Sequence, residues 1–368
     1  MVTNDAARLA ADANRLSRVA LLDAGVPIVR LFSPEHGLSA AGDDGAPAPD
    51  GTDPRTGLPV VSLYGERLAP TRASLADLDL VLFDIPDVGA RFYTYLWTLS
   101  HVMESCAQAG TPLVVLDRPN PLGGDLDAAE GPMLDEEHCA SFVGRWAIPI
   151  RHSLTFGELA RYWQRTRIRG LALHVVACDG WRRRHRWPSL SLPWVRTSPA
   201  MVSFDSALLY PGTCLFEGTT LGVGRGTNAP FRRIVAPWLR PEVVAAEVHD
   251  PTVRLSRGHV VPDQPPYAGV PCASLEIEVL DEGRVRPVAL ALSLLAAIMR
   301  THRAHFAWAP YPTAANPSGA DHFARLAGRR DIAPFLEALG GAPSPSEIAR
   351  WTDVGRWPDA VREMLLYA

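Results

Sequence analysis

Short apolar runs alternate with longer amphipathic segments over the first half of the chain. The runs are rich in Val, Ile and Leu on both faces, which is typical of buried strands in a parallel sheet. They lie at residues 28–32, 60–63, 80–83, 113–116 and 172–178. Apolar residues at helical spacing, and a capping box that begins at Thr155, predict helices over residues 7–24, 95–108 and 156–163. This alternation predicts an α/β fold with a Rossmann-like, mostly parallel sheet.

The pattern changes after about residue 200. A glycine-dense connection at 209–227 is followed by an alternating strand pattern at 275–280 and a strongly apolar helix at 288–300. This mixture is typical of a second, smaller α+β domain. We therefore predict a Rossmann-like catalytic domain over residues 1–215 and a smaller α+β domain over residues 216–368, which closes a cleft between the two.

The composition is that of a soluble globular protein. Hydrophobic residues make up 47% of the 368 positions and charged residues 21%, with a net charge of −4. This balance provides no basic field for nucleic acid or for an anionic membrane. Five widely spaced cysteines without a C-x-x-C pair argue against a disulfide framework and a structural zinc site. The start of the chain lacks the cationic and apolar regions of a secretory signal, so the sequence as written predicts a cytoplasmic protein.

Polar clusters follow three of the predicted strands. They are Ser33-Pro-Glu-His-Gly37, Asp84-Ile-Pro-Asp87 and Asp117-Arg-Pro-Asn120. In open α/β sheets the ligand crevice lies beyond the carboxyl ends of the strands. We therefore expect these acids and arginines to converge on one place, which favours an enzyme active site.

Glu35 is the first candidate for catalysis. It lies in a Pro-Glu-His-Gly turn directly after a strand, where it could cap the following segment or serve as a general acid in a cleft. The sequence favours the acid.

The second cluster continues into a run of charged and aromatic residues. Asp87 and Arg91, four residues apart, could form a plain ion pair at a helix start. However, Tyr93 and Tyr95 follow them, and aromatic rings with adjacent hydrogen-bonding groups are how sugar faces are held. The functional interpretation is favoured here too.

The glycine-dense connection contains the spacing G-x-G-x-G at residues 222–226. It follows no strand of a clear βαβ unit and no Walker-type lysine comes after it, so a nucleotide site is disfavoured. A tight turn that lets Arg225 and Glu217 face a ligand is the better interpretation.

Taken together, these motifs resemble the NamZ-like exo-β-N-acetylmuramidase family. The resemblance covers nearly the whole chain in the right order. It rests on the Ser-Pro-Glu-His-Gly turn and on the segments 84–95, 116–124, 130–132, 141–144, 210–212, 217–219, 224–227 and 364–367.

The resemblance implies a glycoside hydrolase that removes N-acetylmuramic acid from the non-reducing end of peptidoglycan fragments. It implies a Rossmann-like domain, a smaller C-terminal domain and a cleft between them, with Glu35 as the catalytic glutamate. Asp87 or Glu217 is the candidate second carboxyl group, unless the 2-acetamido oxygen of the substrate or a tyrosine takes that role. The candidate substrate-binding residues are His36, Arg91, Tyr93, Tyr95, Arg118, Asn120 and Arg225. A peptidoglycan-derived saccharide is the expected partner, and no metal or organic cofactor is called for.

N-acetylmuramic acid carries a lactyl carboxylate that N-acetylglucosamine lacks. Selectivity for it needs a cation, ideally an arginine that pairs with the carboxylate through two hydrogen bonds. Arg91, Arg118 and Arg225 are the candidates. A protein that only binds muropeptides or amino sugars in the same cleft is the alternative to an enzyme.

Two departures from the family pattern stand out. The family begins with a strand that runs into Val-Thr-Asn, whereas this chain opens at Met1-Val-Thr-Asn4, so a strand and any signal peptide could be lost from its start. In addition, Ala200 stands where the family tends to have Asn, within Ser198-Pro-Ala-Met-Val202. An absent Asn could remove a substrate hydrogen bond worth about 0.5–1.5 kcal/mol.

Overall fold

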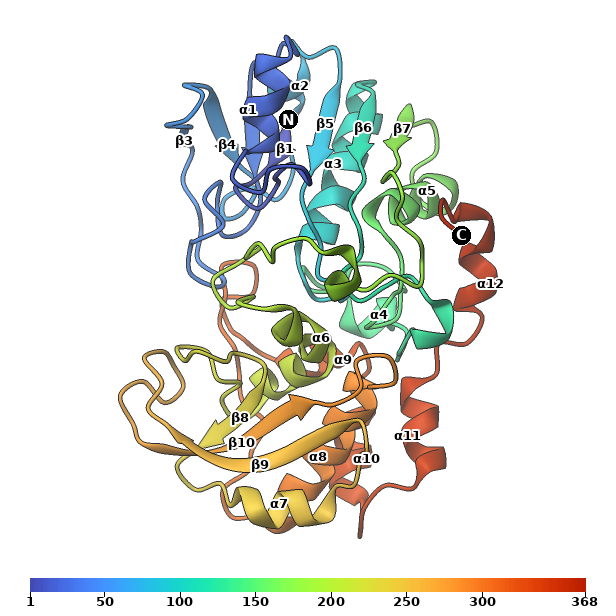
Figure 1. Ribbon diagram of the computed structural model, residues 1–368. Coiled ribbons are helices and arrows are strands. Elements are labelled where there is room, and N and C mark those ends of the chain that lie inside the picture. Colours follow the sequence, from blue (N-terminus) through green and yellow to red (C-terminus); the bar gives the residue numbers. More distant parts are fainter.

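A seven-stranded sheet forms the centre of the first half of the chain, in the computed structural model of residues 1–368 (Figure 1). The spatial order is β3 (Gly51–Thr52), β4 (Pro59–Ser62), β2 (Leu31–Ser33), β1 (Val2–Thr3), β5 (Val81–Asp84), β6 (Leu113–Leu116) and β7 (Leu173–Val176). Only β3 is antiparallel to its neighbour, so the predicted mostly parallel sheet is confirmed. The strand at the start of the chain is present, as two residues between β2 and β5.

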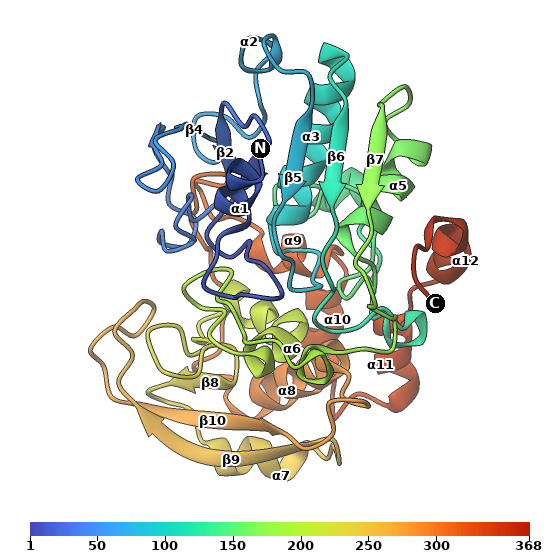
Figure 2. The same ribbon diagram turned by 45° about the horizontal axis from the view of Figure 1, so that its top comes forward.

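Alternate residues of the strands enter two different apolar clusters. Met1 and Leu31 pack on the side covered by α1 (Ser17–Asp23), whereas Val2 and Phe32 belong to the large core on the opposite side. The two long helices α3 (Tyr95–Ala109) and α5 (Phe156–Thr166) cover this second side (Figure 2). Two further helices of one turn each belong to the same half of the chain, α2 (Arg72–Leu75) and α4 (Glu136–Cys139).

A smaller antiparallel sheet organises the second half, with the order β8 (Arg233–Ala236), β10 (Cys272–Val279) and β9 (Val253–Val260). Its helices are α6 (Phe204–Thr213), α7 (Pro241–Glu247), α8 (Pro287–Thr301), α9 (His322–Ala327), α10 (Ile332–Ala338), α11 (Pro345–Thr352) and α12 (Trp357–Val361). Helix α8 packs against α6, α7, α10 and α11. This arrangement confirms the predicted smaller α+β unit.

The last residues of the chain return to the first half. The indole N–H of Trp357 donates to the carbonyl oxygen of His152, and Arg161 donates to the carbonyl oxygen of Met364. In Figure 1 the C-terminus and α12 accordingly lie beside α5 rather than beside the smaller sheet. None of the helices is both long and apolar enough to cross a bilayer.

The helix predicted over residues 7–24 is much shorter than expected, because only Ser17–Asp23 is helical. Polar side chains hold the preceding segment in an irregular path. Asn4 accepts a hydrogen bond from the amide of Ala6, and Arg8 donates to the carbonyl oxygens of Asp5 and Ala13. These local bonds compete with the helical ladder, as short polar side chains commonly do.

Candidate active site

Two cavities open near the carboxyl ends of the parallel strands, and they share no lining residue. The smaller one lies between the two halves of the molecule. One side of it is lined by side chains of the first half, which come from within residues 35–94 and from 141–143. The other side is lined by side chains of the second half, which come from within residues 210–225 and 311–325. Glu35 is among them, so we describe this one as the catalytic cavity.

The turn after β2 positions Glu35. His36 and Gly37 both adopt left-handed backbone conformations, with φ of 66° and 70°, and the amide of Gly37 donates to the carbonyl oxygen of Pro34. A histidine in this region is uncommon and is often found where function fixes the backbone. The side chain of Glu35 is 6% exposed. Its two oxygens accept hydrogen bonds from the amide of Gly45 (3.0 Å) and the hydroxyl of Thr94 (2.5 Å).

Asp44 lies next to Glu35, on the loop between Gly42 and Gly57. One ligand atom from each of Glu35, His36 and Asp44 lies within 4.8 Å of the others, the one such group in the chain. A metal ion could in principle be held there. However, the carboxylate of Asp44 already accepts hydrogen bonds from Tyr311 (2.7 Å) and Arg225 (3.3 Å), which favours two carboxyl groups acting together.

The environments of these two carboxyl groups push their pKa values apart. Burial raises the pKa of Glu35, and the neighbouring charge of Asp44 adds to the rise against the opposing effect of His36. Burial also acts to raise the pKa of Asp44, but Arg225 and His36 outweigh it and the net shift is downward. Two neighbouring carboxyl groups whose pKa values are pushed apart are the arrangement from which an acid and an ionised partner are assigned.

Glu217 and Arg225 complete a charged network in the same cavity. The Nε atom of Arg225 donates to Glu217 at 2.5 Å, and the thiol of Cys214 donates to the other oxygen of Glu217. Burial raises the pKa of Glu217, but the direct ion pair with Arg225 favours its ionised form. The structure therefore brings Glu217 and Arg225 to one cavity with Glu35, and their roles stay predictions.

Helix α9 contributes two side chains that the sequence analysis did not single out. Arg325 is half-buried on the wall of the catalytic cavity, and its guanidinium has neither an ion-pair partner nor a hydrogen bond. His322 stacks on Tyr311, and burial lowers its pKa to about 4. Nothing in the sequence pattern marks this helix, because it has six residues and follows no strand.

Several predicted substrate-binding residues are committed to the fold. Arg91 is fully buried and donates to the carbonyl oxygens of Pro132, Ile148 and Leu326, which ties α9 to the first half of the chain. The hydroxyl of Tyr95 donates to the carbonyl oxygen of Thr197.

Asn120 and Tyr93 differ in their access to the cavity. The side-chain amide of Asn120 donates to the carbonyl oxygen of Leu154 and accepts from the amide of Leu122, and the residue lines neither cavity. Tyr93 lines the catalytic cavity, although its hydroxyl donates to Thr197. His36 also lines it, with Nδ1 bonded to the carbonyl oxygen of Gly42.

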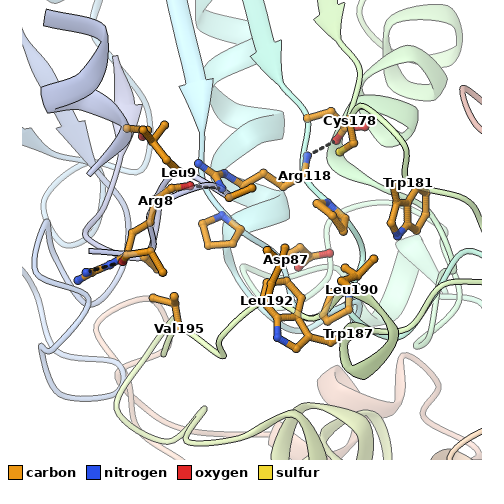
Figure 3. Close-up of a pocket in the computed structure, with 18 of the residues that line it drawn as sticks. Arg8, Leu9, Asp87, Arg118, Cys178, Trp181, Trp187, Leu190, Leu192 and Val195 are labelled. Atoms are coloured by element: carbon orange, nitrogen blue, oxygen red, sulfur yellow. Dashed lines mark hydrogen bonds between the residues drawn. The ribbon is translucent and has the colours of Figure 1, made fainter. Parts of the chain in front are cut away.

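Asp87 and Arg118 line the larger cavity instead (Figure 3). Arg118 donates to Asp84 at 2.5 Å and to the carbonyl oxygen of Arg8. The prediction that all three strand-end clusters meet in one place is thus wrong, because Glu35 lines the catalytic cavity and the other two clusters line the larger one. The segment 187–201 borders both cavities, because several of its residues between Trp187 and Thr197 line the larger one, whereas Ser198, Ala200 and Met201 line the catalytic one.

Comparison with known proteins identifies the family of this chain. Two family models match, described as exo-β-N-acetylmuramidase NamZ, N-terminal (residues 1–205) and C-terminal (residues 208–367). The chain is 38% identical over 276 residues to the peptidoglycan β-N-acetylmuramidase NamZ of Bacillus subtilis (strain 168), a match that covers 74% of this chain and 66% of that protein. It therefore spans slightly less than two thirds of this relative.

Solved structures show the same fold. Two crystal structures of DUF1343 family proteins from Bacteroides fragilis match with TM-scores of 0.86 and 0.73, at 26% and 27% identity. Both matches cover the whole of this chain, and 93% and 92% of the respective structures. With both family models matched in order over nearly all of its residues, this chain belongs to the exo-β-N-acetylmuramidase NamZ family.

Proposed function

We propose that this protein is an exo-acting glycoside hydrolase that releases N-acetylmuramic acid from the non-reducing end of peptidoglycan fragments. Family membership supports the reaction class, and the activity named for the B. subtilis relative, peptidoglycan β-N-acetylmuramidase, supports the substrate. The observation that carries the proposal is the buried carboxyl group of Glu35, with its raised pKa, beside the ionised carboxylate of Asp44 in a cavity between two domains.

Glu35 donates a proton to the leaving glycosidic oxygen, since burial keeps its carboxyl group protonated to higher pH. Asp44 attacks the anomeric carbon as the glycosidic bond breaks, which forms a glycosyl ester. A water molecule that gives its proton to Glu35 then hydrolyses this ester and releases the sugar. One oxygen of each group lies within 4.8 Å of one oxygen of the other, which is short of the roughly 6.5–9.5 Å of inverting enzymes and compatible with the roughly 5 Å of retaining ones. This spacing supports retention of the anomeric configuration. Glu217 has a positioning role: it accepts a hydrogen bond from Nε of Arg225 and so keeps the guanidinium group of Arg225 beside Asp44.

Arg325 is the best placed cation for the lactyl carboxylate. Of the arginines at the catalytic cavity, Arg225 already has two carboxylate partners, whereas Arg325 has none. Arg91 and Arg118, the other two candidates from the sequence, lie away from this cavity. A free guanidinium can form the paired hydrogen bonds that a carboxylate accepts, so Arg325 replaces them in the proposal.

The free space in the catalytic cavity is about 70 Å³, enough for about two water molecules. A sugar ring is larger, so this form of the protein must open to admit one. The loop carrying Asp44 and Gly45 crosses the cavity to the second half of the molecule, where the carbonyl oxygen of Gly45 accepts from the amide of Ala314. Opening of this loop would uncover Glu35.

A pair of chromogenic substrates tests the proposal. The protein is incubated with an aryl β-N-acetylmuraminide and with the matching β-N-acetylglucosaminide, and release of the aryl group is followed. We expect turnover of the first only, with the β-anomer of N-acetylmuramic acid as the first product by proton NMR. A folded protein that binds N-acetylmuramic acid but turns over neither substrate would instead be the sugar-binding protein that the sequence left open.

A further inference from the structure

The larger cavity has a volume of about 730 Å³, within the range of roughly 300–1,000 Å³ that small-molecule sites occupy. It lies beyond the carboxyl ends of β5, β6 and β7 and is closed on one side by the loop after β1. The chain winds outward from β1 in both directions, towards β2 and β4 on one side and β5 to β7 on the other. The cavity is therefore at the switch point where open α/β sheets bind ligands. Figure 3 shows Arg8 and Leu9 on one side of it and Trp181 on the other.

More buried polar atoms without a partner lie on residues of this cavity than on those of the catalytic cavity, where Ser141 Oγ and His322 Nε2 are such atoms. Of the 21 buried side-chain nitrogen and oxygen atoms in the molecule that lack a hydrogen bond, six belong to residues that line the larger cavity. They are Ser17 Oγ, Asp84 Oδ2, both carboxylate oxygens of Asp87, and the indole nitrogens of Trp181 and Trp187. Buried polar groups are normally paired, so a concentration of unpaired ones points to a missing ligand.

Asp87 is the clearest case, because the residue is only 6% exposed and neither oxygen of its carboxyl group has a hydrogen bond. The nearest cation-forming group is Nε2 of His152, at 3.4 Å and without a hydrogen bond. The Nδ1 atom of His152 accepts the amide of Leu154, so a neutral ring carries its proton on Nε2, facing Asp87. Even so, Asp87 retains an oxygen for which the protein provides no donor.

We propose that the larger cavity is a second ligand site, which binds a neutral saccharide unit. Its unpaired atoms include both acceptors, on Asp84 and Asp87, and donors, on two indoles, and a sugar offers hydroxyl groups that satisfy both kinds. Its walls include Trp181, Trp187 and Trp194, whose flat apolar faces suit the apolar face of a sugar ring.

The charges of the lining exclude anionic ligands. Four aspartates line the cavity, Asp84, Asp87, Asp117 and Asp179, against the two arginines Arg8 and Arg118, and Arg118 is already paired with Asp84. Phosphate would meet net negative charge, and the loop from residue 4 to 16 has no glycine to cradle it. A sugar with a carboxylate is disfavoured for the same reason, so this site selects neutral units such as N-acetylglucosamine.

Calorimetric titration with N,N′-diacetylchitobiose, a neutral disaccharide, tests the proposal on three variants. Trp187→Ala removes a wall, and Ala13→Trp fills the cavity without removing a polar group. We expect each to weaken binding at least tenfold, whereas Arg325→Ala, in the catalytic cavity, leaves it unchanged. Hydrolysis of the small aryl muraminide stays within about twofold of wild type in Trp187→Ala and Ala13→Trp, and thermal unfolding confirms that both are folded.

Three results would overturn the proposal: no binding of the disaccharide at millimolar concentration, binding that survives both larger-cavity variants, or binding lost in Arg325→Ala. Equal affinity of the larger cavity for N-acetylmuramic acid would refute its selectivity for neutral units. These outcomes are separate from the proposed hydrolysis, because turnover of the muraminide is measured independently of disaccharide binding.

Discussion

The two cavities differ in how far the protein itself provides hydrogen-bond partners for their carboxyl groups. In the catalytic cavity Glu35, Asp44, Glu217 and Arg225 all have hydrogen-bonded partners within the chain. In the larger cavity Asp87 has none. Groups held in place by their neighbours can act on a reacting bond without reorganising, which is what chemistry needs. Groups left unpaired gain most from a ligand, which is what binding needs. The difference separates a site built for reaction from one built for recognition.

Exchanging one carboxyl group in each cavity gives the largest expected contrast. Glu35→Gln keeps the acceptor for Gly45 but cannot deliver a proton, so we expect kcat to fall about 10²–10⁴-fold with sugar binding retained. Asp87→Asn should change kcat far less, because Asp87 lies outside the catalytic cavity. Steady-state kinetics on the aryl muraminide measures both, with exposed Glu66→Gln as the control. If kcat fell as much in Asp87→Asn as in Glu35→Gln, the assignment of catalysis to the cavity of Glu35 alone would be wrong.

The pH dependence sharpens the assignment of the pair. The raised pKa of Glu35 keeps it protonated as pH rises, so the rate falls only when pH passes that pKa; the lowered pKa of Asp44 sets the acid limb. Asp44→Asn removes the negative charge that helps raise the pKa of Glu35. We expect kcat to fall about 10²-fold or more, the acid limb to flatten and the alkaline limb to move to lower pH.

The control for this profile is Asp43→Asn, the exposed neighbour on the same loop, which should keep the wild-type curve. An alkaline limb that stays in place in Asp44→Asn would mean that another group sets it.

The sequence predicted most of the scaffold, and it singled out Glu35 as a candidate for the same reason. Strong local signals were decisive: the capping box at Thr155 opens α5 as predicted, and Gly110 ends α3 in the left-handed conformation. Glu35 was equally marked, because it follows a strand within a distinctive turn. Local signals failed for residues 7–16, where an Ala/Leu-rich pattern looks helical but polar side chains bind the backbone.

What the sequence could not provide was the path of segments between strands. Asp87 and Glu35 follow different strands at the same edge of the sheet, yet they line different cavities, both of which the segment 187–201 borders. Asp44 lies in the long loop from Gly42 to Gly57, which is rich in Gly, Pro and Asp, and loops of this length commonly carry function, so a signal for it existed. Arg325 had no comparable signal, because only the packing of α9 against the 3₁₀ helix Cys214–Gly218 brings it to the cavity.

Arg325 tests whether selectivity belongs to the catalytic cavity alone. Arg325→Ala removes a charge-assisted bond to the lactyl carboxylate, worth about 1.5–3 kcal/mol, so kcat/KM for the muraminide should fall about 10–150-fold. Any weak activity on the glucosaminide should not change. Arg330→Ala, an exposed arginine nearby, is the matched control. Undiminished preference for the muraminide would assign the carboxylate to Arg225 instead.

A substitution at Ala200 has the smallest expected effect. It tests the difference between the two cavities by adding a polar group to the catalytic cavity, whereas the other substitutions remove one. Ala200 lines the catalytic cavity at the position where the family tends to have Asn, next to the point where the segment 187–201 turns from one cavity to the other. Ala200→Asn places an amide on that wall. One added hydrogen bond contributes about 0.5–1.5 kcal/mol, so KM for the muraminide should fall about 2–10-fold while disaccharide binding in the larger cavity stays the same. Thr197 and Ala200 lie on one continuous segment. A change in both KM and disaccharide binding would therefore show that a shift of this segment at the catalytic cavity also shifts it at the larger cavity.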